Sequence, residues 1–173
     1  MESLTTNETW RLIEDLRFNL AEKPGVGIAA PQIGVSSRVA IVQDPAAFHA
    51  TLGRDRLAEL ERVPLDQYVL INPELEVVGD EIRTFFEGCL SVDGYRGLVC
   101  RHHRVRVRYL DPDGNRHDEV VSGWHARILQ HEIDHLNGIL YVDRMLPRSF
   151  MNVDHYERWA HVSTEVVSDV FGT

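Results

Sequence analysis

The sequence predicts an α+β fold, with mostly antiparallel strands around a central helix and a further helix near the C-terminus. Three observations support it: a helical apolar pattern at the start, short strand candidates between turn residues in the middle, and helical patterns after residue 122. Strands grouped together, with helices before and after them, are typical of α+β domains. The 173 residues suit one domain, which is predicted to span residues 1–173.

The first helix is predicted over residues 7–21, and Lys23, Pro24 and Gly25 are expected to end it because proline and glycine stop helices. Apolar residues recur there at spacings that place them on one broad helix face. The residues expected on this buried face are Trp10, Ile13, Leu16, Phe18 and Leu20.

Strands are predicted through the middle of the chain. Residues 38–43, which are apolar at positions 39–42, indicate a buried strand. Residues 44–67 are polar and indicate a surface excursion with a short helix around residues 54–62. The Asp-Pro-Asp-Gly signal at residues 111–114 predicts a hairpin turn between two later strands. The other strand candidates are residues 68–72, 75–78, 82–86, 104–109 and 117–121, the first three separated by Pro73 and Gly79.

Two helices are predicted after the strands. One runs from about residue 122 to Asn137, where Gly138 can take the left-handed conformation that ends many helices. The other is amphipathic and covers residues 148–170. The first of these helices carries the residues that point most clearly to chemistry.

Composition argues against several classes of function. The formal net charge of −9 disfavours broad binding to nucleic acid or anionic membranes, which requires concentrated Lys and Arg. The sequence has no apolar run long enough to cross a membrane, and its first residues lack the pattern of a secretory signal, so a cytoplasmic location is expected. Two cysteines, Cys89 and Cys100, are too few for a disulfide framework in a chain of this size.

The segment Gln-His-Glu-Ile-Asp-His at residues 130–135 carries the strongest chemical signal. On a helix, His131 and His135 leave the same face one turn apart and can share a divalent metal ion, with Glu132 beside them to handle a proton of water. The plainer alternative is a polar helix face with two surface histidines. A catalytic metal site of this type needs a third ligand, and the candidates are Cys89 upstream or His155, Glu157 and His161 downstream.

Two further segments are weak signals when taken alone. Cys89 stands in Glu-Gly-Cys-Leu-Ser at residues 87–91, but a lone cysteine is more commonly a small buried core residue than a ligand. The stretch Gly-Val-Gly-Ile-Ala-Ala-Pro-Gln at residues 25–32 is too rich in small residues for an ordinary strand and lets a backbone pass close to a ligand. A plain turn is the alternative for this stretch.

Together, the three segments resemble the three motifs of the peptide deformylase family. Residues 25–32 match Gly-x-Gly-x-Ala-Ala-Pro-Gln, residues 87–91 match Glu-Gly-Cys-Leu-Ser, and residues 130–135 match Gln-His-Glu-x-Asp-His. The resemblance covers residues 7–147, and three motifs in the right order are far more specific than any one of them. Family members normally carry an early strand and a proline-rich stretch before the first helix, and this chain is expected to lack that segment.

The resemblance implies a metal-dependent hydrolase. Cys89, His131 and His135 would hold one divalent metal ion, which is typically Fe(II) in the family, although Zn, Ni or Co can occupy such a site. Glu132 would take a proton from water and later deliver it to the leaving amine.

Oxyanion stabilisation and substrate binding are implied by position in the same way. The side-chain amide of Gln32 and the backbone N–H of Leu90 would stabilise the oxyanion. Trp124 stands where the family usually has leucine or phenylalanine, so an inward-facing indole would make the pocket shallower; an outward-facing indole at the helix start is the alternative. The residues implied for substrate binding are Val26, Gly27, Phe85, Gly88, Arg96, Trp124, Arg127 and Ile128.

The implied activity is hydrolysis of the N-formyl group on the formyl-methionyl residue of a peptide or nascent chain, giving formate and a free amine. Three alternatives stay open: an amidase acting on another acyl group or a small biosynthetic intermediate, a metallopeptidase in which a His or Glu replaces Cys89, and a non-enzymatic metal-binding relative. The acidic segment at residues 148–173 would be repelled by RNA phosphate, so ribosome docking through it is not expected.

Overall fold

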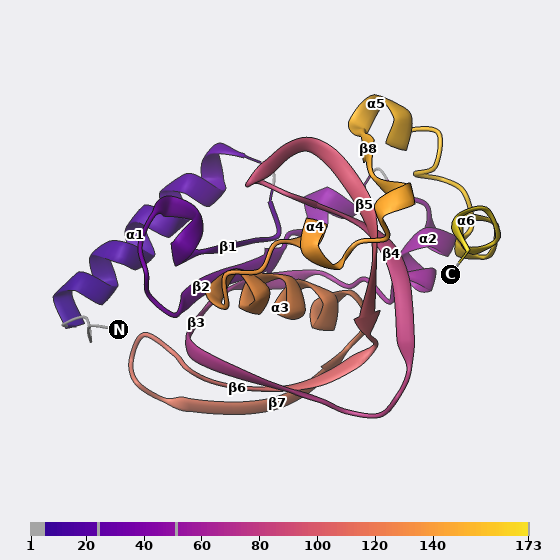
Figure 1. The fold of residues 1–173 in the computed structure, drawn as a ribbon. Coiled ribbons are helices and arrows are strands. Elements are labelled where there is room, and N and C mark those ends of the chain that lie inside the picture. The colour runs from indigo at the N-terminus through magenta and orange to yellow at the C-terminus, as the bar shows by residue number, and fades with distance from the viewer. Residues whose placement is uncertain (1–5, 24, 51, 173) are drawn as a thin grey trace.

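The computed structural model describes residues 6–23, 25–50 and 52–172 (Figure 1). Two antiparallel sheets lie around a central helix, α3 (Gly123–Leu136), which Figure 1 shows between the larger sheet and the strands β4 and β5. The predicted α+β fold of mostly antiparallel strands around this helix is therefore confirmed. None of the helices in the described ranges combines the length and apolar character needed to span a bilayer.

The larger sheet has the strand order β1-β2-β3-β6-β7, and the smaller sheet has the order β4-β5-β8. Strand β1 thus lies at an edge of the larger sheet. The larger sheet consists of β1 (Gly27–Ala29), β2 (Val39–Asp44), β3 (Leu65–Val77), β6 (Arg104–Leu110) and β7 (Arg116–Ser122). The smaller sheet consists of β4 (Ile82–Cys89), β5 (Val92–His102) and β8 (Met151–Asn152).

The prediction of two strands separated by Pro73 is wrong, because β3 continues through this residue. The pairing of β3 with β6 shifts register between Ile71 and Glu74, and Asn72 takes a positive φ of 51°. Such a bulge removes local pairing where proline has no N–H to donate.

Three other strands differ from expectation. The small-residue segment at residues 25–32 does form a strand, β1, of three buried residues, and a short 3-10 helix, η1 (Ala30–Ile33), follows it. Strand β5 was not predicted, because Gly94, Gly97 and interspersed charged residues obscure the alternation of apolar and polar positions. Strand β4 extends beyond the predicted residues 82–86 and ends at Cys89.

Helix α1 (Thr6–Glu22) forms as predicted, but its buried face differs. Its buried residues lie on a stripe about 100° wide, outside which Trp10 and Phe18 remain 39% and 67% exposed. The expected helix stop at Pro24 lies outside the described residues. The buried residues are Leu12, Ile13, Leu16 and Leu20, which pack against Ile28 and Ile41 of the larger sheet.

Helix α3 begins and ends where the sequence predicts. Ser122 precedes its first residue, Asn137 ends it, and Gly138 follows with a left-handed φ of 75°. The side chain of Gln130 fixes the helix to β5. It donates a 2.8 Å hydrogen bond to the carbonyl of His102 and accepts a 3.1 Å bond from the backbone N–H of His102. Residues on most sides of α3 are buried because it packs against both sheets.

Residues 44–67, called here the insertion, are more than the surface excursion expected. They contain the 3-10 helix η2 (Ala46–His49) and the short helix α2 (Arg54–Glu59). Asp44 and Leu60 are buried, and Arg62 donates two hydrogen bonds of 2.7 Å to the Asp44 carboxylate. This buried ion pair fixes one end of the insertion to the end of β2.

The single helix expected over residues 148–170 is wrong. The chain forms several short elements there, because Pro147 starts a 3-10 turn and the Asn152 side chain caps a new helix by accepting a bond from His155 N–H. Residues 153–171, called here the C-terminal segment, pack Trp159, Val167 and Phe171 against Phe86 and Leu98 of the smaller sheet. Helix α4 (Tyr141–Arg144) precedes this part of the chain, which then forms η3 (Pro147–Ser149), β8 (Met151–Asn152), α5 (Val153–Tyr156) and α6 (Thr164–Phe171).

Candidate active site and metal centre

The three side chains expected to hold a metal ion lie together where β4 meets α3. Cys89 is the last residue of β4, and His131 and His135 stand one turn apart on α3. Their donor atoms all lie within 4.8 Å of one another, and Cys89 Sγ is 3.2 Å from His135 Nε2. The downstream candidates His155, Glu157 and His161 do not join this group.

The electrostatics of the trio favour a thiolate at Cys89. Burial opposes the charged thiolate, but the hydrogen bonds and charges of His131 and His135 outweigh it and lower the pKa of Cys89 to about 5. Burial also opposes a charged imidazole at His131, yet hydrogen bonds to Cys89 and Glu87 raise the pKa of His131 to about 10. Because metal ions bind the thiolate and not the thiol, the cysteine is prepared for ligation near neutral pH.

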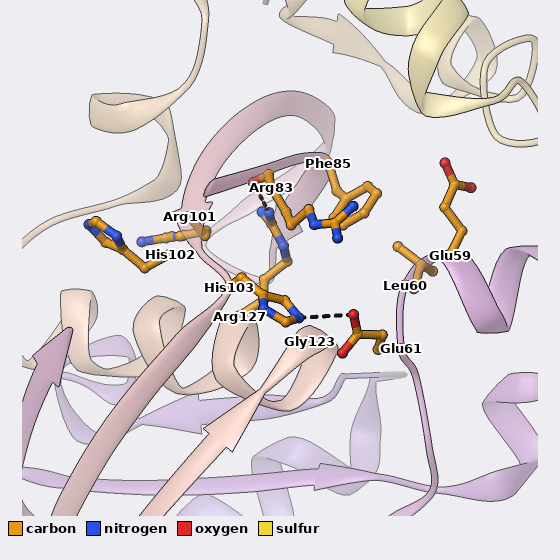
Figure 2. Close-up of a pocket in the computed structure, with 10 residues that line it drawn as sticks. All are labelled: Glu59, Leu60, Glu61, Arg83, Phe85, Arg101, His102, His103, Gly123 and Arg127. Atoms are coloured by element: carbon orange, nitrogen blue, oxygen red, sulfur yellow. Dashed lines mark hydrogen bonds and ion pairs between the residues drawn. The ribbon is translucent and has the colours of Figure 1, made fainter. Parts of the chain in front are cut away.

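Glu87 orients the first histidine from behind. Its carboxylate accepts a 2.9 Å hydrogen bond from His131 Nδ1, which leaves Nε2 for the metal side. Burial opposes a charged carboxylate, but hydrogen bonds from His131 and Arg101 hold the pKa of Glu87 well below its usual range. Arg127 also donates to Glu87 at 2.6 Å and to the carbonyl of Arg83 at 2.6 Å, the second of which is drawn in Figure 2.

Of these supporting residues, Glu87 and Arg101 were not assigned roles from the sequence, whereas Arg127 was expected only in the substrate pocket. Glu87 belongs to a recognised motif, so its position was a signal. Arg101 gave none, because it reaches Glu87 from β5, a strand that the sequence did not reveal. The two arginines neutralise a carboxylate that would otherwise be costly to bury beside the site.

Glu132 faces the site as a buried carboxylate with one unpartnered oxygen. The residue is 3% exposed, and its Oε2 atom has no hydrogen-bond partner within the described part of the chain. Burial raises the pKa of Glu132 to about 7, although the charges of His131 and His135 oppose the rise. A buried polar atom without a partner points to a water or substrate group as its natural partner. A carboxylate that titrates near neutral pH suits proton transfer.

Gly27 has no side chain, and the Glu132 carboxylate occupies the space that a side chain would fill. A Cβ atom built on this glycine would overlap Oε1 and Cδ of Glu132. We therefore expect Gly27→Ala to displace the carboxylate and lower kcat by about 100-fold while the metal is retained, because about 1 Å of misplacement can cost that much. Steady-state formate release and metal analysis would measure the two effects.

Gly53→Ala is the matched control for this change. Gly53 has ordinary backbone angles, and a Cβ there meets nothing within 4 Å. Turnover in Gly27→Ala equal to that of Gly53→Ala would show that the close approach to Glu132 does not matter.

Gln32 lies in η1 with its amide orientation fixed. Its Oε1 accepts a 2.8 Å hydrogen bond from the N–H of Ala29, so its Nε2 points toward Ser91 Oγ at 3.1 Å and Cys89 Sγ at 3.6 Å. Leu90 follows Cys89 in the chain and lines the same cavity. The two residues expected to supply oxyanion donors therefore stand next to the candidate ligand Cys89.

A cavity of about 850 Å³ opens over the trio. It is lined by every site residue expected from the sequence except His135, which is buried behind it. The sequence did not predict that the insertion and the C-terminal segment would line this cavity too. The residues that they contribute are Ala47, Phe48, Leu52, Arg56, Leu60, Arg62, Tyr156, Ala160 and His161.

The trio fits a metal ion by its donor chemistry. One sulfur and two imidazole nitrogens converge, Glu87 fixes one histidine ring, and an unpartnered carboxylate oxygen stands beside them. Three protein ligands with an open side are typical of catalytic sites, whereas structural sites use four. The cluster supports a single divalent metal ion.

Comparison with known proteins decides the family. The profile of the polypeptide deformylase family matches residues 1–150 of the chain. The chain belongs to this family. Among its relatives, this deformylase is 44% identical over 163 residues to peptide deformylase 3 of Streptomyces avermitilis, covering 94% of the chain and 71% of that protein. It is 41% identical over 157 residues to the chloroplastic peptide deformylase 1A of Solanum lycopersicum, covering 91% of the chain and 57% of that protein.

Solved structures of the family share the fold of this deformylase. A class I type b peptide deformylase from Acinetobacter baumannii, bound to Met-Ala-Ser, aligns with a TM-score of 0.69 and 38% identity over 82% of this chain and 84% of the other. A probable peptide deformylase from Synechococcus phage S-SSM7 aligns with a TM-score of 0.68 and 30% identity over 83% and 88% of the two chains. The predicted family, and the enzyme class that it carries, are thereby confirmed.

Proposed function

We propose that this deformylase removes the formyl group from the N-terminal formyl-methionyl residue of peptides, releasing formate and a free amine. We further propose that residues 1–173 act as one catalytic domain. The observation that carries the proposal is the Cys89, His131 and His135 trio beside the unpartnered Glu132 carboxylate, at the base of a cavity large enough for a peptide.

The trio would hold one divalent metal ion, for which Fe(II) is the expected occupant and Zn, Ni or Co are alternatives. When bound, the ion supplies Lewis acidity that polarises the formyl carbonyl and makes water more acidic. Cys89, as a thiolate, contributes negative charge, and Glu87 keeps His131 in the tautomer that offers Nε2.

The protein groups carry the remaining chemistry. Glu132 takes one proton from water as the water oxygen bonds to the formyl carbon. The Gln32 amide, fixed by Ala29, and the Leu90 N–H stabilise the oxyanion formed from the carbonyl oxygen. Glu132 then passes its proton to the peptide nitrogen as the carbon–nitrogen bond breaks. The hydroxyl proton that remains from the water passes to the amine, so that formate and the protonated amine leave.

The protein has an edge strand beside the cavity that can pair with the backbone of the substrate. Strand β1 lies at an edge of the larger sheet, and Gly25, Val26 and Gly27 line the cavity. An extended peptide can add to such an edge through main-chain hydrogen bonds. The Acinetobacter baumannii relative holds Met-Ala-Ser, which supports a peptide as the ligand here.

Trp124 lines the pocket for the first substrate side chain, which favours the inward-facing alternative. Its ring lies 6.5 Å from that of Phe85, and the Arg62 guanidinium stands 5.0 Å from the indole. We expect Trp124→Leu to raise kcat/KM for formyl-Met relative to formyl-Ala peptides by about 10-fold, because pocket depth discriminates by methylene groups. An unchanged ranking of formyl-Met, formyl-Leu and formyl-Ala peptides would exclude Trp124 as the residue that limits the pocket.

The experiment that tests the proposed reaction uses anaerobically purified protein and three matched peptides. Formyl-Met-Ala-Ser should yield formate and Met-Ala-Ser, whereas acetyl-Met-Ala-Ser and free Met-Ala-Ser should persist by mass spectrometry. Acetate release at a comparable rate would favour the amidase alternative. Cleavage of the Met–Ala bond would favour the metallopeptidase.

A further inference from the structure

The cavity is larger than the side chain of one substrate residue requires. At about 850 Å³ it falls in the upper part of the range, about 300–1,000 Å³, that encloses drug-sized ligands. The trio and Trp124 account for only part of its lining. Residues of the insertion, called here the outer wall, and residues of the C-terminal segment also line it.

The insertion extends the wall of the first pocket outward. Arg62 stands over the Trp124 ring, and the Arg56 guanidinium lies 5.5 Å from the centre of the Phe85 ring. Figure 2 shows Leu60 of the insertion on the side of the α2 helix, across from Phe85 of β4. The insertion therefore lies on the same side of the cavity as the pocket for the first side chain.

The insertion also presents apolar side chains to the cavity. Phe48 and Leu52 line it and are only half-buried, so each keeps apolar surface in contact with solvent. Half-buried apolar side chains that line a cavity are suited to an apolar ligand.

The C-terminal segment holds this outer wall in place. Glu59 accepts a 3.0 Å hydrogen bond from the N–H of Thr164 and a 2.5 Å bond from Arg56, and Arg56 also donates to Thr164 Oγ1 at 3.4 Å. Figure 1 shows α2 and α6 at the same end of the molecule, as these bonds require. The outer wall is thus anchored to a second part of the fold.

The geometry of an extended peptide indicates which substrate residue would contact the outer wall. Successive side chains of an extended chain point to opposite sides, so the third residue faces the same side as the first. With the first side chain against Phe85 and Trp124, the third faces the insertion. We propose that Phe48 and Leu52 form a subsite for an apolar side chain at the third residue of the formylated peptide, an inference that rests on the proposed function.

The test is a series of formyl-Met-Ala-X peptides in which X is Ala, Leu, Phe or Asp. The wild-type protein should show kcat/KM about 10-fold higher for Leu or Phe than for Ala, the low end of what an apolar pocket discriminates. Phe48→Ala and Leu52→Ala should each reduce that preference to about 2-fold or less. Calorimetric binding of the deformylated Met-Ala-X products should follow the same order, which gives a readout that does not depend on turnover.

Val63→Ala is the control, because Val63 belongs to the insertion but is 66% exposed and does not line the cavity. It should retain the wild-type preference. Equal kcat/KM across the wild-type series, an undiminished preference in both cavity variants, or a preference that appears instead in a formyl-Met-X-Ala series would overturn the subsite. Failure of the proposed function would look different, since no peptide in either series would then release formate.

Discussion

Glu132→Gln should retain its metal and lose at least about 100-fold in kcat, the usual scale for removing a general base. Glutamine keeps the shape of glutamate, but its amide cannot accept the proton of water. The site makes this loss large, because Glu132 is a buried carboxylate beside the trio with an unpartnered oxygen, and its pKa of about 7 suits proton transfer at neutral pH. Formate release under saturating formyl-Met-Ala-Ser and metal analysis of the same sample measure the two parts.

Glu14→Gln is the control for this substitution. Glu14 is exposed on α1, and its change should leave kcat at the wild-type value. Near-normal turnover by metal-loaded Glu132→Gln would place the base elsewhere in the site.

Cys89→Ala should lose its metal on dialysis and, with it, formate release. The two histidines that remain form an incomplete set, and the loss of the thiolate removes the ligand with a formal charge. Because changes even in residues behind the ligands cost 10–100-fold in metal affinity, we expect the loss of a ligand to exceed about 100-fold. Metal content after dialysis against a graded chelator series would measure it.

Cys100→Ala separates this effect from a general loss of thiol. Cys100 is exposed on β5 and pairs with Thr84, so its removal should leave the metal bound. Full metal retention by Cys89→Ala would show that the cysteine is not a ligand.

The parts of the fold that depend on local sequence were predictable. Helix α3 follows from its start at Ser122, its Gly138 stop and the four-residue spacing of its histidines, all of which are encoded within one short segment. Cys89 entered the predicted site mainly through its motif, because a lone cysteine is more commonly a buried core residue than a ligand.

The parts that depend on contacts between distant residues were not predictable. Arg101 reaches Glu87 across two strands, and its own strand was hidden by Gly94 and Gly97. Trp10 and Phe18 match a helical pattern as well as their neighbours do, and only the packing of α1 against the larger sheet leaves them exposed.

The contact between the insertion and the C-terminal segment was not predictable for the same reason. The polar sequence of the insertion predicts a surface loop and the amphipathic C-terminal sequence predicts a helix. In the structure, Glu59 and Thr164 bond to each other across 105 positions of the chain. That contact brings two surface segments over one cavity. No local pattern carries such information, because it depends on how the two sheets pack on α3.

A metal titration tests most directly whether one metal ion in the Cys89, His131 and His135 site carries deformylation. Chelated protein would be titrated anaerobically with Fe(II), or with Ni(II) for stability in air, while formate release from formyl-Met-Ala-Ser is recorded. The rate should rise in proportion to added metal and break at about one equivalent per chain, the stoichiometry of a single three-ligand site. Formate release by the metal-free protein, or the same titration curve in Cys89→Ala, would contradict the claim.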